Sequence, residues 1–166
     1  MKFSRPEDLH LEAVELSEVL ARLRPVLDAE AGKHDVALSI EIPAALPAVE
    51  GDSHLLEQAF LNLALNAYQA MPDGGRLRIS AHESAGRIVT VEVEDSGQGI
   101  APEHLSQIFD LYYTTKPDGS GIGLSVVFRT VQLHNGEIEV QSTLGRGTTF
   151  RIHLKQAARM FQGLGG

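Results

Sequence analysis

The sequence contains no cysteine and no tryptophan among its 166 residues. Without cysteine, the chain can hold neither a disulfide framework nor a thiolate zinc site. It also has no apolar run long enough to span a bilayer, and its first ten residues, MKFSRPEDLH, lack the apolar core of a signal peptide. We therefore expect a cytoplasmic domain without direct membrane contact, whether its parent protein is soluble or membrane-attached.

Basic residues are scarce, with 14 Lys and Arg against 22 Asp and Glu, which gives a formal net charge of −8. So acidic a balance argues against a nucleic-acid-binding protein, because phosphate contacts need a basic surface. A small anionic ligand would instead need backbone N–H groups, a few placed cations or a metal ion. The hydrophobic content of 43% and the chain length indicate one globular domain with its own core.

Hydrophobic spacing predicts helices and strands in an order that is not strict β-α-β alternation. A helix is expected over residues 13–32, with Pro25 kinking or interrupting it, and a second helix follows the cap residues Asp52 or Ser53 and ends near Met71. Residues 43–52 are predicted to be a loop. Shorter helices are expected at 102–108 and 122–134, and alternation predicts strands at 36–42, 77–81, 89–93, 138–140 and 148–154. This order predicts an α+β fold, a two-layer sandwich with a mixed five-stranded sheet and three to four helices on one face.

The predicted helix that starts at residue 53 carries a stripe of side-chain amides. Gln58, Asn62, Asn66 and Gln69 are spaced four, four and three residues apart, so they share one helix face. Asparagine is a mediocre helix former, and a buried amide without a partner costs roughly 1–3 kcal/mol. Two interpretations stay open: a polar network or exposed seam, or a ligand face whose amide oxygens suit Mg²⁺.

A first glycine motif, Asp95-Ser96-Gly97-Gln98-Gly99-Ile100, directly follows a predicted strand. Its glycines let a flat ligand approach the backbone. The Asp95 carboxylate could accept a hydrogen bond from the exocyclic amine of adenine, which would favour adenine over guanine. The alternative is an ordinary Asp-Ser-Gly turn.

A second glycine motif, Gly119-Ser120-Gly121-Ile122-Gly123-Leu124, precedes a predicted helix. Alternating glycines at a helix N-terminus expose N–H groups in a favourable dipole, which suits phosphate. Thr114-Thr115-Lys116 just before it adds hydroxyl donors and a cation, and a flexible hinge would not explain these residues. The motif matches neither a Walker A loop nor a dinucleotide fingerprint.

Taken in order, the asparagines, the Asp95 motif, the alternating glycines and Gly147-Thr148-Thr149-Phe150 resemble the Bergerat ATP-binding fold. Gyrase, heat-shock chaperones, histidine kinases and mismatch-repair ATPases share that fold. The stretches LLEQAFLNLALNAYQAMPDGGRLRI and IFDLYYTTKPDGSGIGLSVV are similar to those of sensor histidine kinases of the nitrogen-regulation-like branch. The resemblance implies a catalytic ATP-binding domain over 13–155, a remnant of a dimerisation helix and linker over 1–12, and a C-terminal tail over 156–166.

The resemblance implies ATP and Mg²⁺ as cofactors, with Asn62, Asn66 and Lys116 acting in catalysis. Asn66 would bind Mg²⁺, and Asn62 would face the phosphates or their water. The remaining implied roles are Asp95 on the adenine amine; Gly97, Gly99, Ile100, Thr148 and Thr149 around the base; Thr115, Lys116, Gly119, Gly121, Gly123 and the N–H of Leu124 on the phosphates; and Phe109 and Tyr113 as anchors of a mobile lid.

The resemblance implies donation of the ATP γ-phosphoryl group to a histidine outside this chain, because none of the seven histidines lies in a phosphoacceptor motif. The implied partners are the dimerisation and phosphoacceptor helices of the same kinase and, through the full-length protein, a response regulator; the isolated domain is expected to be a monomer.

Asn62 stands where gyrase-type ATPases place a glutamate base, which disfavours fast hydrolysis. Many histidine kinases carry a basic residue where this chain has Gln69. The alternative to an enzyme is a nucleotide-gated binding module of the same fold, such as an anti-sigma factor.

Overall fold

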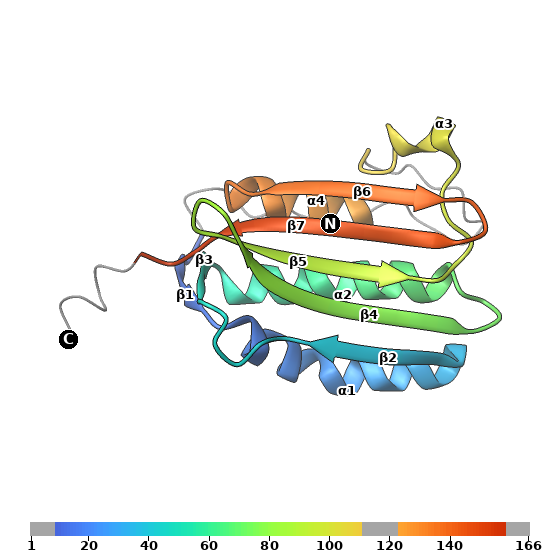
Figure 1. The fold of residues 1–166 in the computed structure, drawn as a ribbon, viewed down its shortest axis with the longest axis horizontal. Coiled ribbons are helices and arrows are strands. Elements are labelled where there is room, and N and C mark those ends of the chain that lie inside the picture. The colour runs from blue at the N-terminus through green and yellow to red at the C-terminus, as the bar shows by residue number, and fades with distance from the viewer. Residues whose placement is uncertain (1–8, 111–122, 159–166) are drawn as a thin grey trace.

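The computed structural model describes residues 9–110 and 123–158, and its main feature is a five-stranded mixed sheet (Figure 1). The strands are β2 (Val36–Glu41), β4 (Gly75–Ser84), β5 (Ile88–Asp95), β6 (Glu137–Thr143) and β7 (Gly147–Lys155). They lie in the order β2-β4-β5-β7-β6. β2 runs parallel to β4, and every other neighbouring pair is antiparallel.

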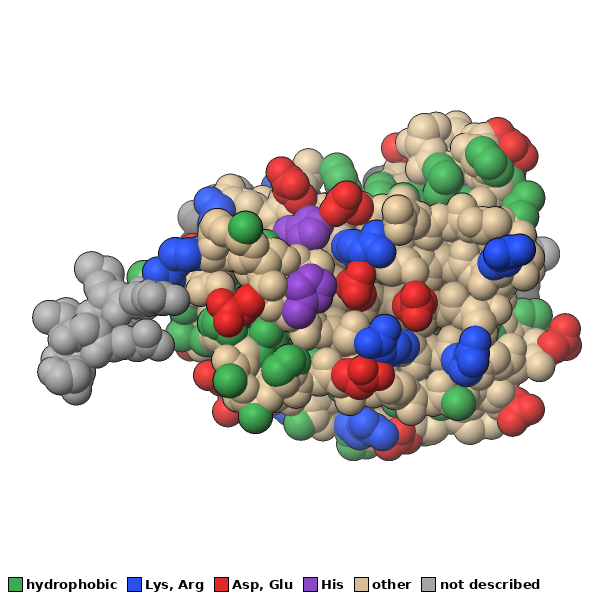
Figure 2. All heavy atoms as spheres, viewed as in Figure 1, with side chains coloured by type: hydrophobic (Ala, Val, Ile, Leu, Met, Phe, Trp, Pro, Cys, Tyr) green, Lys and Arg blue, Asp and Glu red, His purple; other side chains and the backbone are tan. Residues whose placement is uncertain are grey.

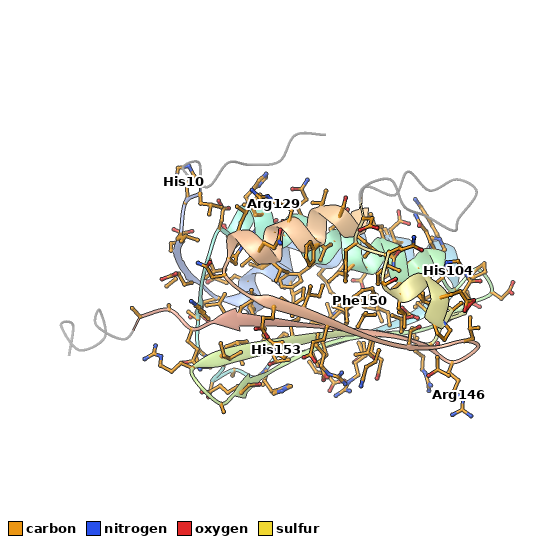
Figure 3. The ribbon with its side chains drawn as sticks, turned by 90° about the horizontal axis from the view of Figure 1, so that it is seen from above. His10, His104, Arg129, Arg146, Phe150 and His153 are labelled. Carbon is orange, nitrogen blue, oxygen red and sulfur yellow. The ribbon has the colours of Figure 1, made fainter. Side chains whose placement is uncertain are left out.

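The long helices all lie on one face of this sheet. They are α1 (Leu16–His34), α2 (Ser53–Gln69) and α4 (Gly123–Leu133), and the short α3 (Pro102–Leu105) lies beside β6. The helices are behind the strands in Figure 1, and Figure 3 shows the two layers edge-on. The predicted α+β two-layer sandwich is therefore confirmed. Within the described residues, no helix combines the length and the apolar character needed to cross a membrane.

Two short strands were not predicted. β1 (Glu12–Val14) and β3 (Val49–Gly51) pair antiparallel in a separate two-stranded sheet. The predicted loop at 43–52 was therefore wrong at its end, and the first helix begins at Leu16 rather than 13, because strands of three residues are too short to show a period. The predicted interruption of this helix was also wrong. α1 continues through Pro25, which is exposed, while Leu20, Leu23 and Leu27 hold both halves of the helix on the core.

Side chains alternate along β5 and β7, and this places the apolar core residues of each strand on the same face as the polar residue at its end. Val91 and Val93 of β5 and Phe150 of β7 are each no more than 2% exposed. Figure 3 shows Phe150 between the sheet and the helices. Period-two geometry puts Asp95 and Thr148 on that same face. Each is 5% exposed. The buried face of the sheet therefore turns polar at one end.

The opposite face of the sheet is open and charged, as Figure 2 shows. The guanidinium of Arg78 donates to both carboxylate oxygens of Glu41, at 2.9 and 3.1 Å, and Arg151 pairs with Glu92. Hydrogen bonds from Arg78 and then Ser39 lower the pKa of the Glu41 carboxyl. Ion pairs that remain accessible to solvent contribute little stability, so the core and not this face holds the fold together.

Tyr68 joins α2 to α1 inside the core. Its hydroxyl donates to the carbonyl oxygen of Leu27 at 2.9 Å, and its ring stacks on His34 with the ring centres 5.6 Å apart. The side chain is fully buried. Burial, followed by the charge of Asp28, raises the pKa of Tyr68 to about 12.

We expect Tyr68→Phe to lower the free energy of unfolding by about 1 kcal/mol at neutral pH, since one buried hydrogen bond is lost. Because the folded-state pKa of Tyr68 is above the unfolded-state value near 10, the wild type loses stability as the pH rises from 10 to about 12. The Tyr68→Phe protein lacks this contribution and should lose less stability over that range. Denaturant unfolding at several pH values compares the two, and parallel declines would contradict the assignment.

Candidate functional site

Asp95 is the last residue of β5, and its carboxylate is fixed by backbone groups. One oxygen, Oδ1, accepts the N–H of Gly97 at 2.9 Å and the N–H of Thr148 at 3.3 Å. Thr148 lies directly opposite Asp95 on β7. The carboxylate therefore joins the sheet, the glycine loop that follows it and the neighbouring strand, and its position is set before any ligand arrives.

The loop of residues 96–101 is held from two sides. On one side, the N–H of Gln98 donates to the carbonyl of Ala70 at the end of α2, at 3.0 Å. A Cβ on Gly97 would lie 2.5 Å from that same carbonyl oxygen, so only glycine allows this approach. On the other side, the N–H of Gly145, in the turn between β6 and β7, donates to the carbonyl of Gln98 at 2.8 Å. This geometry is that of a clamped loop, not of a free turn.

Two hydroxyl groups continue the polar end of the buried sheet face. Ser142 of β6 lies opposite Thr148 of β7, and their hydroxyl oxygens are 2.7 Å apart. The Ser142 hydroxyl also accepts the N–H of Ile100 at 2.7 Å. Thr149, by contrast, pairs with Glu94 on the open side of the sheet. Of the two threonines expected near the base, the structure brings only the side chain of Thr148 next to Asp95.

The amide stripe lies on α2, which is otherwise buried on most sides. Asn62 and Asn66 are half-buried, and Gln58 and Gln69 are exposed, so a ligand can reach the stripe from solvent. The predicted cap is confirmed: Oδ1 of Asp52 accepts the N–H groups of His54 at 3.1 Å and Leu55 at 3.2 Å.

A metal ion at this site would depend on amide oxygens. Over residues 9–110 and 123–158, no three His, Asp or Glu side chains are close enough together to hold one. The donor set therefore fits a hard cation that keeps water ligands and shares a bound phosphate, which is how Mg²⁺ binds.

The other expected site residues are partly within the described chain. Gly123 and Leu124 begin α4 and are half-buried. The expected lid anchor Phe109 stacks on Phe128 at 5.3 Å and meets Phe150 edge-on at 6.1 Å, so it is tied to the core. Tyr113, Thr115, Lys116, Gly119 and Gly121 lie outside the described residues.

Two polar residues were not predicted: Ser142, beside Thr148 at the site, and His134, at the opposite end of α2 beside its cap residue Asp52. His134 is 4% exposed, and its Nδ1–H donates to the carbonyl of Thr130 at 2.7 Å. Its Nε2 therefore carries a lone pair, which accepts a hydrogen bond from the backbone N–H of Asp52 at 3.0 Å. This bond ties the end of α4 to the cap of α2. The only signal in the sequence was a polar residue on an apolar face, such as Ser142 two residues after Val140.

Comparison with known proteins identifies the arrangement. Residues 51–158 match the family of histidine kinase-, DNA gyrase B- and HSP90-like ATPases. This chain belongs to that family. The domain resembles sensor histidine kinase ZraS of Salmonella typhi, with 36% identity over 96% of this chain and 34% of the relative. It also resembles sensor kinase CckA of Brucella abortus, with 38% identity over 93% of this chain and 18% of the relative.

Solved structures agree with this assignment of the ATPase domain. Full-length ShkA in complex with AMPPNP matches with a TM-score of 0.82 and 27% identity, over 93% of this chain and 33% of ShkA. The catalytic domain of histidine kinase ThkA matches with a TM-score of 0.79 and 26% identity, over 89% of this chain and 96% of that domain. The expected ATP-binding domain of the histidine kinase type is confirmed, and the chain spans about a third of the length of the ZraS relative.

The clamped loop gives a prediction for Gly99, whose φ is +77° and whose added Cβ would lie 2.3 Å from the carbonyl oxygen of Thr143. Gly86 has nearly the same φ, +79°, with nothing within 4 Å, so it is a matched control. Both alanine variants carry the cost of positive φ, and only Gly99→Ala adds a backbone clash. We expect Gly99→Ala to destabilise the domain by about 2 kcal/mol more than Gly86→Ala in thermal unfolding. Equal losses would show that the loop is not clamped.

Proposed function

We propose that this domain binds Mg-ATP at Asp95 and the amide stripe of α2, and that it donates the γ-phosphoryl group to a histidine on separate dimerisation helices. The observation that carries the proposal is the buried carboxylate of Asp95, held by two backbone N–H groups at the end of the apolar sheet face. The proposed catalytic domain covers residues 13–155, with a dimerisation remnant over 1–12 and a tail over 156–166.

The base is proposed to bind at Asp95. A carboxylate is an acceptor only, so it favours a ligand edge that presents hydrogens, such as the exocyclic amine of adenine. Gly97 and Gly99 have no side chains to block the flat base, and Ile100 supplies apolar contact beside them. Because Asp95 is already fixed, little ordering cost remains when the nucleotide binds.

The phosphates and Mg²⁺ are proposed to bind between the amide stripe and the start of α4. Asn66 would supply a carboxamide oxygen to the ion, and Asn62 would face the phosphates or a water of the ion. The N–H groups at Gly123 and Leu124 open a helix, which is a favourable place for negative charge. Thr115, Lys116, Gly119 and Gly121 are proposed to contact the phosphates from the lid, with Phe109 and Tyr113 as its anchors.

The proposed chemistry is transfer of a phosphoryl group to an imidazole nitrogen. The bond from the γ-phosphorus to the bridging oxygen breaks, a phosphorus–nitrogen bond forms, and ADP leaves with the electron pair. Bound Mg²⁺ would neutralise charge on the phosphate oxygens. The side chain of Asn62 cannot accept a proton as glutamate does, which disfavours activation of water. The protein's own contribution is then positioning and electrostatic stabilisation.

The remaining parts of the reaction are proposed to lie outside this domain. The phosphoacceptor histidine would come from the dimerisation helices of the same kinase, and a response regulator would take the phosphoryl group from it. The ZraS and CckA relatives are sensor kinases several times longer than this domain, which supports such partners. We further propose that the isolated domain is a monomer and works in the cytoplasm.

Asp95→Asn tests the base site, with Glu94→Gln as its matched control. Both changes remove one carboxylate at the end of β5, but Glu94 lies on the exposed face. The amide that replaces the Asp95 carboxylate can keep its oxygen toward the two backbone N–H groups, so the fold should persist. We expect Asp95→Asn to weaken ATP binding about tenfold or more, and Glu94→Gln to leave it unchanged, in calorimetric titrations. Equal affinities in all three proteins would refute the site.

Asn66→Ala tests phosphoryl transfer, with His54→Ala as control, because His54 is exposed at the start of the same helix and lies outside the amide stripe. The domain is mixed with Mg-ATP labelled in the γ-phosphoryl group and with the dimerisation helices of its parent kinase. We expect acid-labile phosphohistidine from the wild type and His54→Ala, and about a hundredfold less from Asn66→Ala, because the metal contact is lost. No phosphohistidine from the wild type, or rapid release of free phosphate instead, would contradict the proposed function.

A further inference from the structure

Ser142 lies at one end of a row of three polar side chains that crosses the sheet. Asp95 pairs with Thr148, and Thr148 pairs with Ser142, so the three residues occupy one level of β5, β7 and β6. On β4 the same level is occupied by the fully buried Leu77. The row is therefore a polar insertion at the end of an apolar face, and the hydrogens of its two hydroxyls can be assigned.

The single hydrogen of the Ser142 hydroxyl has a definite acceptor. Its oxygen lies 3.1 Å from the carbonyl oxygen of Gly147, which can only accept, so Ser142 is the donor in that bond. The N–H of Ile100 donates to Ser142 at 2.7 Å and uses one lone pair. Ser142 then has one acceptor position left and no hydrogen to give.

This assignment decides the direction of the bond between the two hydroxyls. The oxygens of Ser142 and Thr148 are 2.7 Å apart, which requires a hydrogen between them. Because the hydrogen of Ser142 is already donated to Gly147, the one between the hydroxyls comes from Thr148. The remaining hydrogen-bonding capacity of the Thr148 hydroxyl is therefore acceptor only.

We propose that Ser142 is a positioning residue for base specificity, which acts by turning the hydroxyl of Thr148 into an acceptor beside Asp95. This inference rests on the proposed binding of adenine at Asp95. An acceptor hydroxyl next to a carboxylate complements an amine with two hydrogens. A base with a carbonyl at that position would place lone pairs against lone pairs, and such a mismatch in a buried site is costly.

ATP and inosine triphosphate separate this role from a structural one, because inosine carries a carbonyl where adenine carries the amine. Without Ser142, the Thr148 hydroxyl is free to turn and donate to that carbonyl. We expect Ser142→Ala to reduce the preference for ATP over inosine triphosphate about tenfold, equal to about 1.4 kcal/mol, in calorimetric titrations. If the alanine variant folds poorly, Ser142→Cys takes its place, because cysteine has a similar shape and forms only weak hydrogen bonds. It should also reduce the preference for ATP.

Two further variants complete the test. Thr143→Ala, the next residue of β6 with an exposed side chain, should keep the wild-type preference. In a Thr148→Val background, Ser142→Ala should leave the preference unchanged, because Ser142 acts only through the Thr148 hydroxyl. A wild-type preference in Ser142→Ala and Ser142→Cys, or an equal change with and without the Thr148 hydroxyl, would overturn this inference alone. Failure of the wild type to bind either nucleotide would refute the proposed function, and this inference with it.

Discussion

The carboxylate of Asp95 accepts two backbone N–H groups, from Gly97 and Thr148, and the rest of the site is arranged around that pair of bonds. They tie the end of β5 to the loop after it and to β7. The loop then hydrogen-bonds to the end of α2 through Gln98. The buried Asp95 side chain therefore connects α2, which carries the asparagines, to the sheet. Asp95 is only 5% exposed, and a carboxylate so deeply buried needs hydrogen-bond donors of this kind.

The periodic elements of the fold could be predicted from the sequence, and the two three-residue strands could not. Alternation at Val89, Val91 and Val93 marked β5 correctly, and its continuation in the same register put Asp95 on the buried face. β1 and β3 have only three residues each and were missed. Their pairing joins segments far apart in the chain, which local patterns do not record.

The candidate site was predicted in outline because its motifs are local. Glycines near Asp95 and the asparagines on one helix face could be read directly from spacing. The hydroxyl row and the bond between His134 and Asp52 depend on the register of β6 on β7 and on how α4 packs against α2. Tertiary contacts of this kind carry no sequence period. The register of β5 on β7 places Thr148 beside Asp95, and alternation along β7 places its neighbour Thr149 on the other face.

Nucleotide is proposed to bind on the helix-facing end of β5 and β7 and to leave the open face of the sheet untouched. Backbone amide NMR spectra, recorded while Mg²⁺ and a non-hydrolysable ATP analogue are added, distinguish the two faces. We expect the largest shifts at the amides of Gly97 and Thr148, whose bonds hold Asp95, and small ones at Arg78 and His82 on the open face. Shifts concentrated on the open face, or none at Gly97 and Thr148, would contradict it.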